Sequence, residues 1–512
     1  MATPQEKLAE SLKILNGLQN ENGIAVISPG SISRSHKDRL VENGFLQEVL
    51  RGWYISVKPG EPIGSTSSWY PSFWYFISVY FNERFRDQWC LSPEQSIAFH
   101  SGNYNVPTQL LVRSPRASNN STKLLHNTSF FELKGKIPDK QDIEVVGEGL
   151  NLMSIPTALI ACSSDYFTKY SIEARTVLLS IKDSSEILRR LLDGGHTKIA
   201  GRLVGAFRNV GRDKIANEIL TTMRKAGYDV RETDAFDSII SLSGNSRGVS
   251  PYVNRIKIMW HQMRKEVLDV FPESQGIKND FDDCIKNIDN AYNSDAYHSL
   301  SIEGFKVTPE LIENVKTGNW DPDQNKDYRD HKDALAARGY WKAFQAVKSS
   351  IKDIYSGENP GSVVDNSYQT WYQELFAPSV LAGIITASDL AGFRSGQVII
   401  TGSMHTPPGH EAVRDAMPTL IDLLIEENEA SVRAVLGHFI FVFIHPYTDG
   451  NGRMARFLMN TQLISGGFPW TIINLEERNE YMAALEKAST KNDISDFAKL
   501  IARKANEGTK SK

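Results

Sequence analysis

The chain has 512 residues, and its 57 lysines and arginines against 61 aspartates and glutamates leave a net charge of −4. This balance excludes the strong overall basic excess that is typical of proteins bound to nucleic acid or anionic membranes. The length predicts about three domains. Three scattered cysteines exclude a cysteine zinc site and favour a reducing compartment. Because the chain has neither a basic-then-apolar leader nor an apolar run of ~20 residues, we expect a cytoplasmic protein without a membrane span.

Residues 1–60 predict a small N-terminal domain. Leucines at helical spacing indicate a helix over 5–18, and a second, shorter helix is expected to end at Gly44. Residues 45–55 predict two strands around an Arg-Gly turn. Helix, helix and hairpin in this order resemble a winged helix, and they are similar to the N-terminal domain of AbiEi-type antitoxin regulators.

The predicted winged helix is a candidate DNA-binding surface. Residues 31–60 carry five basic side chains against three acidic ones, an excess of +2. DNA binding usually neutralises several phosphates, so this excess is small. Possible DNA contacts are placed in residues 31–55, and docking of a partner protein is the alternative.

Residues 61–240 predict a small α/β to helical region that resembles the body accompanying AbiEi-type winged helices. The aromatic stretch Trp69–Phe81 contains Pro71 and is too short to cross a membrane. Nothing in this region indicates chemistry. Strands are expected at 110–113, 124–133 and 143–146, and helices at 173–181, 185–193, 198–209 and 214–227.

A Gly-, Ser- and Asn-rich stretch at 241–251 predicts a linker before a last domain over residues 251–505. This domain is expected to be mainly helical. Polar loops are predicted at 317–330 and 357–366. Helices are predicted at 252–270, 332–349, 380–388, 411–427 and 431–444.

Two short patterns precede the most informative loop. Ser299 and Glu303 are four residues apart, so both face one side of a helix near 290–304, and Gly304 suits its end. Further on, the β-branched run Val398-Ile399-Ile400-Thr401 before a glycine predicts an edge strand of a hairpin.

Residues 445–456 read His-Pro-Tyr-Thr-Asp-Gly-Asn-Gly-Arg-Met-Ala-Arg, between two apolar segments. We interpret them as a tight polar loop between two helices. Its glycines expose backbone N–H groups, and the following helix offers its N-terminus to an anion. Asp449 suits magnesium, Arg453 and Arg456 suit phosphate oxygens, and His445 suits a general base.

The loop resembles the signature of Fic-domain proteins, with Tyr447 in place of the usual phenylalanine. The resemblance implies a mainly α fold with a β-hairpin flap, and transfer of AMP from ATP to a hydroxyl side chain of a target protein, which includes the protein itself. It implies His445 as the base, Asp449 as the Mg²⁺ ligand, and the Gly450-Asn451-Gly452 backbone, Arg453 and Arg456 as the groups that bind the phosphates. Because a phosphotransferring branch carries lysine at the second glycine, Gly452 favours nucleotidyl transfer.

The same resemblance gives roles to the other patterns. Ser299, Glu303 and Gly304 fit the inhibitory motif of the family, whose glutamate pairs with the second arginine, here Arg456. The flap at 398–401 would pair with the target backbone. Asn460 and Tyr481 are candidates for an adenine pocket, with structural roles as the alternative.

Two classes of function remain open. The first is a magnesium-dependent adenylyltransferase that is inhibited by Glu303, or the reverse enzyme, which would use Glu303 to remove AMP. The second is a DNA- or partner-binding regulator whose Fic site senses nucleotide.

Overall fold

The computed structural model describes residues 3–20, 23–61, 66–238, 250–277, 280–320 and 332–510. The predicted linker at 241–251 and the loop at 317–330 lie mostly outside the described residues. The chain forms two compact units. The N-terminal unit comprises residues 1–255 and 399–406, and the helical unit comprises residues 256–398 and 407–512.

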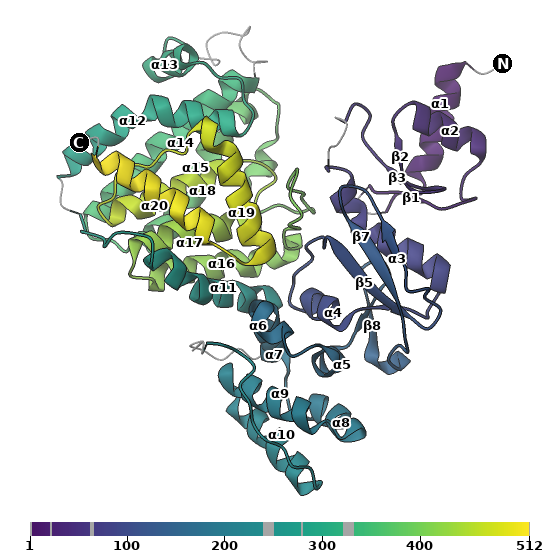
Figure 1. Ribbon diagram of the computed structural model, residues 1–512. Coiled ribbons are helices and arrows are strands. Elements are labelled where there is room, and N and C mark those ends of the chain that lie inside the picture. The colour runs from purple at the N-terminus through teal and green to yellow at the C-terminus, as the bar shows by residue number, and fades with distance from the viewer. Residues whose placement is uncertain are drawn as a thin grey trace. The chain divides into compact units, whose positions relative to one another are not determined.

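The N-terminal unit begins with the predicted two helices and hairpin (Figure 1). Thr3 forms a capping box with Glu6 at the start of the first helix. The three strands pair antiparallel in the order β1-β3-β2. Leu15, Ile27 and Leu40 are buried in a small shared core. The elements are α1 (Pro4–Asn16), β1 (Val26–Ile27), α2 (Arg34–Glu42), β2 (Leu46–Leu50) and β3 (Trp53–Ser56).

An aromatic core fills the next part of this unit. The stretch from Trp69 forms a helix whose buried face, with Phe73 and Phe76, packs with Trp89 and Phe130. A mixed sheet of order β4-β5-β7-β6 contains the parallel pair β5 and β7, and β8 pairs with β9. The elements are α3 (Trp69–Phe85), β4 (Cys90–Leu91), α4 (Pro93–His100), β5 (Gln109–Ser114), β6 (Ser121–Lys123), β7 (Ser129–Lys134), β8 (Ile143–Val146) and β9 (Leu150–Met153).

Six helices complete the N-terminal unit. Their apolar faces are buried, with Leu191, Phe207 and Ile219 fully enclosed. The four helices predicted between 173 and 227 are present with shifts of a few residues at their ends. The elements are α5 (Ile155–Ala161), α6 (Tyr166–Lys169), α7 (Ser171–Ser180), α8 (Ser185–Gly194), α9 (Thr197–Asn209) and α10 (Asp213–Lys225).

The helical unit confirms the prediction of a mainly α fold. α17 and α18 lie at its centre, with other helices around them (Figure 1). Almost every side chain of α17 is buried, which explains its nearly continuous apolar sequence. The elements are α11 (Pro251–Leu268, which begins in the N-terminal unit), α12 (Phe281–Ile302), α13 (Pro309–Thr317), α14 (Lys332–Tyr355), α15 (Pro360–Leu381), α16 (His410–Glu426), α17 (Ala430–Ile444), α18 (Asn451–Ser465), α19 (Arg478–Lys491) and α20 (Ser495–Lys510).

Close helix contact explains one glycine of this unit. A Cβ on Gly339 of α14 would clash with the carbonyl of Leu375 on α15. The two helices therefore approach each other closely, and α15 stays against the bundle. This matters for the site because α15 supplies aromatic side chains that pack on the loop at 445–456.

Two predictions near α15, one of a loop and one of a helix, are wrong. The loop predicted at 357–366 ends at Asn359, whose side chain caps the N–H groups of Gly361 and Ser362, so that Pro360 begins α15. The helix predicted at 380–388 is absent, because α15 ends at Leu381 and Gly383 adopts a positive φ of 73°.

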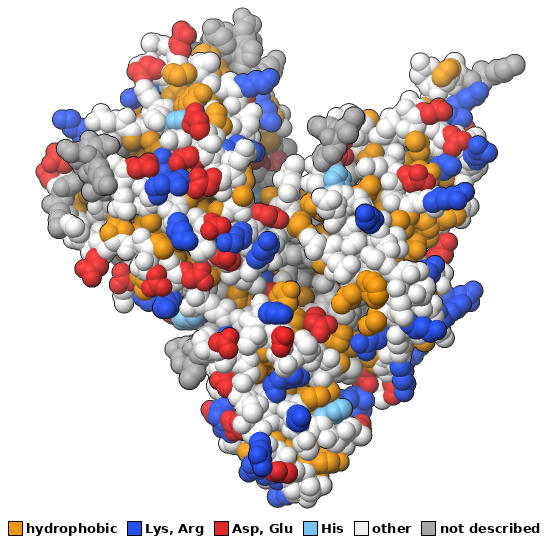
Figure 2. Space-filling view, in the orientation of Figure 1, with side chains coloured by type: hydrophobic (Ala, Val, Ile, Leu, Met, Phe, Trp, Pro, Cys, Tyr) orange, Lys and Arg blue, Asp and Glu red, His pale blue; other side chains and the backbone are white. Residues whose placement is uncertain are grey.

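Among the described residues, no helix combines the length and the apolarity that crossing a bilayer requires. On the face shown in Figure 2, basic and acidic side chains are interspersed over the helical unit. That face therefore carries no large patch of one charge sign.

Candidate active site

The loop after α17 has the predicted helix–loop–helix form. His445 ends α17 in a left-handed conformation with φ 53°, and Gly450 precedes α18 with φ 85°. The Asn451 side chain holds the loop closed, because its Nδ2 donates to the Tyr447 carbonyl at 2.8 Å and its Oδ1 accepts from the Tyr447 N–H at 3.0 Å. The side chain of Asn451 is thus structural, and its backbone lies in the first turn of α18.

The packing of Tyr447 explains how the loop accommodates a tyrosine at this position. The side chain is 2% exposed, and its ring stacks on Tyr372 of α15 with centroids 3.6 Å apart and planes 7° apart. Offset or stacked aromatic pairs add stability beyond their burial. The stack therefore fixes the loop against the bundle.

His445 is half-buried. Burial lowers its pKa to about 4, with Arg394 acting in the same direction, while the backbone of Val442, Glu303 and Asp449 raise it. Nδ1 lies 3.3 Å from the carbonyl oxygen of Val442. Because a carbonyl only accepts, Nδ1 carries the proton and Nε2 keeps a lone pair. His445 can therefore take a proton at neutral pH.

Asp449 and Arg453 differ sharply in exposure. The Asp449 side chain is 64% exposed, whereas that of Arg453 is 2% exposed, and they approach to 3.3 Å. The Arg453 guanidinium lies 5.1 Å from the ring centroid of Phe305 and 5.2 Å from that of Phe376. Its buried Nε and Nη2 have no hydrogen-bond partner among the described residues.

These two side chains fit the groups that the loop is predicted to bind. Magnesium usually takes one or two carboxylates and completes its shell with water and phosphate oxygens, and Asp449 offers such an exposed carboxylate. Buried polar atoms normally find partners. The two unsatisfied nitrogens of Arg453 fit a ligand with oxygen acceptors, such as a phosphate.

Arg456 contacts the two polar residues of the upstream motif. Its Nε donates to Ser299 Oγ at 2.8 Å, and its Nη2 donates to the Ser299 carbonyl at 3.1 Å and to Glu303 Oε1 at 2.7 Å. Arg456 is 3% exposed. Burial alone would lower its pKa, but Glu303 raises it above the ordinary value. The prediction that Glu303 pairs with the second arginine is confirmed as a contact.

The Glu303 carboxylate also lies against the first turn of α18. A Cβ added to Gly452 would clash with Glu303 Oε1. The end of α12 fixes this position, since Gly304 has φ 89° and the Phe305 N–H donates to the Leu300 carbonyl. A helix N-terminus attracts anions, so the carboxylate occupies a position that favours negative charge.

Asp295 is a site residue that sequence analysis missed. It lies on α12 four residues before Ser299 and accepts a hydrogen bond from the Tyr340 hydroxyl at 2.6 Å. Burial raises its pKa to about 6, and Tyr340 and Arg456 lower it. Asp295, Ser299 and Glu303 therefore form one polar face of α12. The four-residue spacing was a signal that could have found it.

Arg394 is a second missed residue. It is 6% exposed, and its Nε donates to the His445 carbonyl at 2.8 Å. Nη1 donates to the Gly396 carbonyl at 2.8 Å, and Nη2 donates to the Pro408 carbonyl. Arg394 thus ties both ends of the segment 396–408 to the catalytic loop. These acceptors are backbone groups, which no sequence pattern marks.

The predicted flap differs from a paired hairpin. Residues 398–401 are not assigned to a strand, and the Ser403 N–H donates to the Ile400 carbonyl in a tight turn. The returning arm contains Pro407 and Pro408, which have no N–H to donate to a ladder. Ile399 is 51% exposed. The strand prediction is therefore wrong, although the segment does turn back and leaves its first arm accessible.

Asn460 and Tyr481 are buried structural residues. Asn460 is 1% exposed and exchanges two hydrogen bonds with the Thr471 backbone. Tyr481 is also 1% exposed, and its hydroxyl bonds His438 Nε2 at 2.8 Å. Their polar groups are used inside the core, so these side chains do not offer the predicted adenine contacts.

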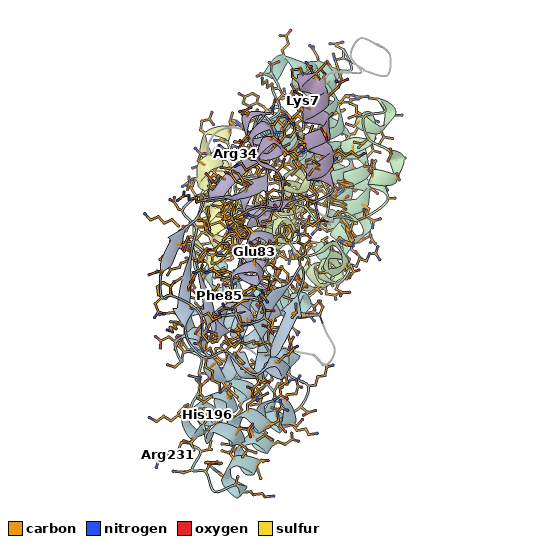
Figure 3. All side chains as sticks on the ribbon, turned by 90° about the vertical axis from the view of Figure 1, so that its right-hand side faces the viewer. Lys7, Arg34, Glu83, Phe85, His196 and Arg231 are labelled. Carbon is orange, nitrogen blue, oxygen red and sulfur yellow. The ribbon has the colours of Figure 1, made fainter. Side chains whose placement is uncertain are left out.

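The basic residues of α2 offer little to DNA. Arg34, labelled in Figure 3, has a 91% exposed side chain but pairs with Asp38. Lys37 also lies 3.3 Å from Asp38. Arg39 turns inward and donates to the Lys7 carbonyl and to Ser11. The small basic excess of this segment is thus partly neutralised or structural.

Comparison with known proteins agrees with the loop geometry. Residues 368–463, from α15 to α18, match the model of the Fic/DOC family. Protein adenylyltransferase Fic of Nematostella vectensis is 32% identical over 221 residues, which is 42% of this chain and 47% of that protein. Protein adenylyltransferase fic-1 of Caenorhabditis elegans is 36% identical over 102 residues, 19% of this chain and 20% of that protein.

The matched parts are limited in extent. The chain covers about half or less of the length of these relatives. A solved structure of Fic-1 from C. elegans aligns with 67% of this chain and 95% of that chain, at 18% identity and a TM-score of 0.37. Residues 368–463 are thus similar to the Fic/DOC family, and the chain is similar in sequence to proteins named protein adenylyltransferase Fic.

Proposed function

We propose that the chain is a magnesium-dependent protein adenylyltransferase, and that Glu303 inhibits it from within the same chain. The single observation that carries this proposal is the contact of Glu303 with both Arg456 and the first turn of α18. A carboxylate there takes the position that suits a phosphate. Relatives named protein adenylyltransferase support the reaction class.

The reaction follows from the groups on the loop. The hydroxyl oxygen of a serine, threonine or tyrosine on the target attacks the α-phosphorus of ATP, and Nε2 of His445 takes the hydroxyl proton. The bond between the α-phosphorus and the β-bridging oxygen breaks, so that AMP is joined to the target and pyrophosphate leaves. A magnesium ion held by Asp449 would neutralise charge on the phosphates.

The buried cations and the backbone of α18 would hold the remaining phosphate oxygens. Arg453 has two unsatisfied nitrogens, and the N–H groups of Gly452 and its neighbours lie at the helix N-terminus. Arg456 would hold the γ-phosphate once Glu303 has moved away. The loss of the Glu303 pair is thus the step that permits a productive ATP pose.

The test of the chemistry uses the Glu303→Gly variant, with ATP labelled at either the α- or the γ-phosphate. We expect label from α-labelled ATP to join protein, no label from γ-labelled ATP, and equal release of pyrophosphate. Adding His445→Ala should lower the rate about 10²- to 10⁴-fold, the usual contribution of a general base. Transfer of the γ-label, or unchanged transfer without His445, would overturn the proposal.

Removal of AMP is a second candidate reaction, because Glu303 lies close enough to raise the pKa of His445. The carboxylate would then position a water on the AMP–protein bond. Labelled Glu303→Gly protein, freed of ATP, is incubated with wild type. If the label is lost with wild type but not with added protein that lacks Glu303, the result supports this activity. Label that stays on the protein excludes it.

A DNA-binding regulator remains the alternative with less support. The pairing of Arg34 and Lys37 with Asp38 leaves few free cations in residues 31–55. Binding to DNA of its own promoter at low salt that weakens steeply as salt rises would support it. No shift at low salt would reject it.

A further inference from the structure

The segment 399–406 belongs to the N-terminal unit, although the residues on both sides of it belong to the helical unit. Arg394 donates to the carbonyls of Gly396 and Pro408, which flank this segment on its two sides. This segment follows Val398 and includes most of the predicted target-docking flap. Its conformation therefore depends on contacts made within the N-terminal unit.

Three contacts join the segment to two consecutive residues after α4. The Val106 N–H donates to the Met404 carbonyl at 3.0 Å. Nδ1 of His405 lies 3.0 Å from Asn105 Oδ1, and the same oxygen accepts from the Thr406 N–H at 3.4 Å. His405 is 4% exposed, and Met404 packs against the aromatic core. The contacts are largely shielded from water, so they are not the weak kind found between exposed groups.

A chain of polar contacts, buried at its Glu173–Arg255 end, holds Asn105 in place. The Asn105 N–H donates to Asn103 Oδ1 at 3.2 Å, and Asn103 Nδ2 donates to Glu173 Oε1 at 2.8 Å. Glu173 forms an ion pair with Arg255 at 3.1 Å, and both side chains are 1% exposed. Removing one partner of such a pair leaves a buried charge, which is strongly destabilising. The loop that carries Asn105 is therefore firmly anchored.

We propose that Asn105 is a positioning residue for target modification: the N-terminal unit fixes the flap through Asn105, so that the exposed backbone around Ile399 is presented in one conformation to the target protein. This inference rests on the proposed function. A fixed strand-like segment binds a target backbone with less loss of entropy than a mobile one. Asn105 touches neither ATP nor the reacting atoms in this scheme, so it acts through the flap alone.

The first test measures hydrogen–deuterium exchange in the full chain and needs no catalysis. Asn105→Ala is compared with Asn120→Ala, an exposed asparagine of the same unit. We expect amides in 399–406 to exchange at least ~10-fold faster in Asn105→Ala, since local opening becomes easier. Asn120→Ala should match wild type. Unchanged exchange in Asn105→Ala would overturn the proposal that Asn105 fixes the segment 399–406, whether or not the protein transfers AMP.

The second test measures transfer in the Glu303→Gly background, with a His445→Ala copy of the chain as the protein target. Asn105→Ala should lower the transfer rate to that copy by about 10-fold and leave KM for ATP within a factor of two. Asn120→Ala should change neither. Faster exchange with undiminished transfer would reject the positioning role. If Glu303→Gly itself transfers nothing, the proposed function fails. The exchange result still decides whether Asn105 fixes the segment 399–406.

Discussion

Arg456 makes three hydrogen bonds to the end of α12, and in the proposed function its guanidinium would bind a phosphate instead. Arg453, one turn earlier, has no hydrogen-bond partner for Nε among the described residues, and its Nη2 lies 3.3 Å from Asp449. The protein thus supplies hydrogen-bond acceptors to Arg456, whereas the buried Nε of Arg453 is left for a ligand. His445 completes it with a lone pair on Nε2, because Nδ1 faces the Val442 carbonyl.

The pH dependence of transfer tests the state of His445. Its pKa is lowered from 6.5 to about 4, so the neutral form is already complete well below pH 6.5. Removal of Glu303 takes away a group that raises this pKa, so the variant should titrate no higher. We expect transfer by Glu303→Gly to vary less than twofold between about pH 6 and 8. A half-maximal rate near pH 6.5 would show an unshifted imidazole.

Substitution of Arg394 tests the importance of its hydrogen bonds to the carbonyls of Gly396, Pro408 and His445. Lysine keeps the charge but loses the planar fork that reaches several carbonyls at once. We expect Arg394→Lys to lower transfer in the Glu303→Gly background about 10- to 100-fold, because small misplacements of catalytic groups have effects of this size. Arg414→Lys, at an exposed position on α16, is the matched control. Equal transfer rates in the two variants would show that these hydrogen bonds of Arg394 do not matter for transfer.

At the scale of elements, α12 presents one polar face with Asp295, Ser299 and Glu303 at four-residue spacing. The face contacts α14 through Tyr340 and α18 through Arg456. Gly304 then ends the helix, so Glu303 lies at its last turn. A helix end frays more readily than a helix centre. Release of Glu303 therefore requires only local movement, while Asp295 keeps the rest of α12 docked.

The pH dependence of stability tests Asp295. Its folded-state pKa of about 6 lies above the ordinary 3.8. The folded state thus holds the proton more tightly, and the contribution of this group to stability falls as the pH rises through about 6. We expect Asp295→Asn to gain about 1.4 kcal/mol relative to wild type from pH 5 to pH 8, by denaturant unfolding. A stability difference between the two proteins that does not change with pH would contradict the raised pKa of the Asp295 carboxyl.

At the scale of the whole molecule, the chain passes between its two units at 255–256 and on both sides of the segment 399–406. The buried chain from Arg255 through Glu173 to Asn105 lies within the N-terminal unit and reaches both of these places. The proposed positioning of the flap by Asn105 therefore rests on contacts made within this unit.

Ligand-induced stabilisation provides a test at this scale. A ligand that binds only the folded state stabilises it by about 2.7 kcal/mol at a hundred times its Kd. If Glu303 competes with ATP phosphates, magnesium-ATP should raise Tm more in Glu303→Gly than in wild type at equal concentration. Arg456→Ala should remove most of that difference. Identical shifts in wild type and Glu303→Gly would argue against competition.

The sequence predicted the parts of the site that are contiguous. Residues 445–456 carry their chemistry in twelve positions, and Ser299 and Glu303 follow helical spacing. Arg394 was not predictable, because it acts through backbone carbonyls 51 positions away. The pairing of the Asn460 amide with the Thr471 backbone was not predictable either, because only the fold brings the two together.

The fold was predictable to a similar degree. Long apolar-periodic helices such as α16 and α17 were found nearly to the residue. The start of α15 was taken for a loop, since Asn-Pro-Gly is typical of turns as well as of a capped helix start. The flap failed as a strand because pairing depends on a partner arm, and that arm contains two prolines.

Inhibition of AMP transfer by Glu303 is the central proposal. The decisive measurement is the initial rate at which α-labelled ATP modifies protein, in wild type, Glu303→Gly and the exposed control Glu310→Gly. We expect a rate about 10- to 100-fold higher in Glu303→Gly, because one or two charge-assisted hydrogen bonds are lost, and no change in Glu310→Gly. A rate in Glu303→Gly equal to that of wild type would contradict inhibition by Glu303.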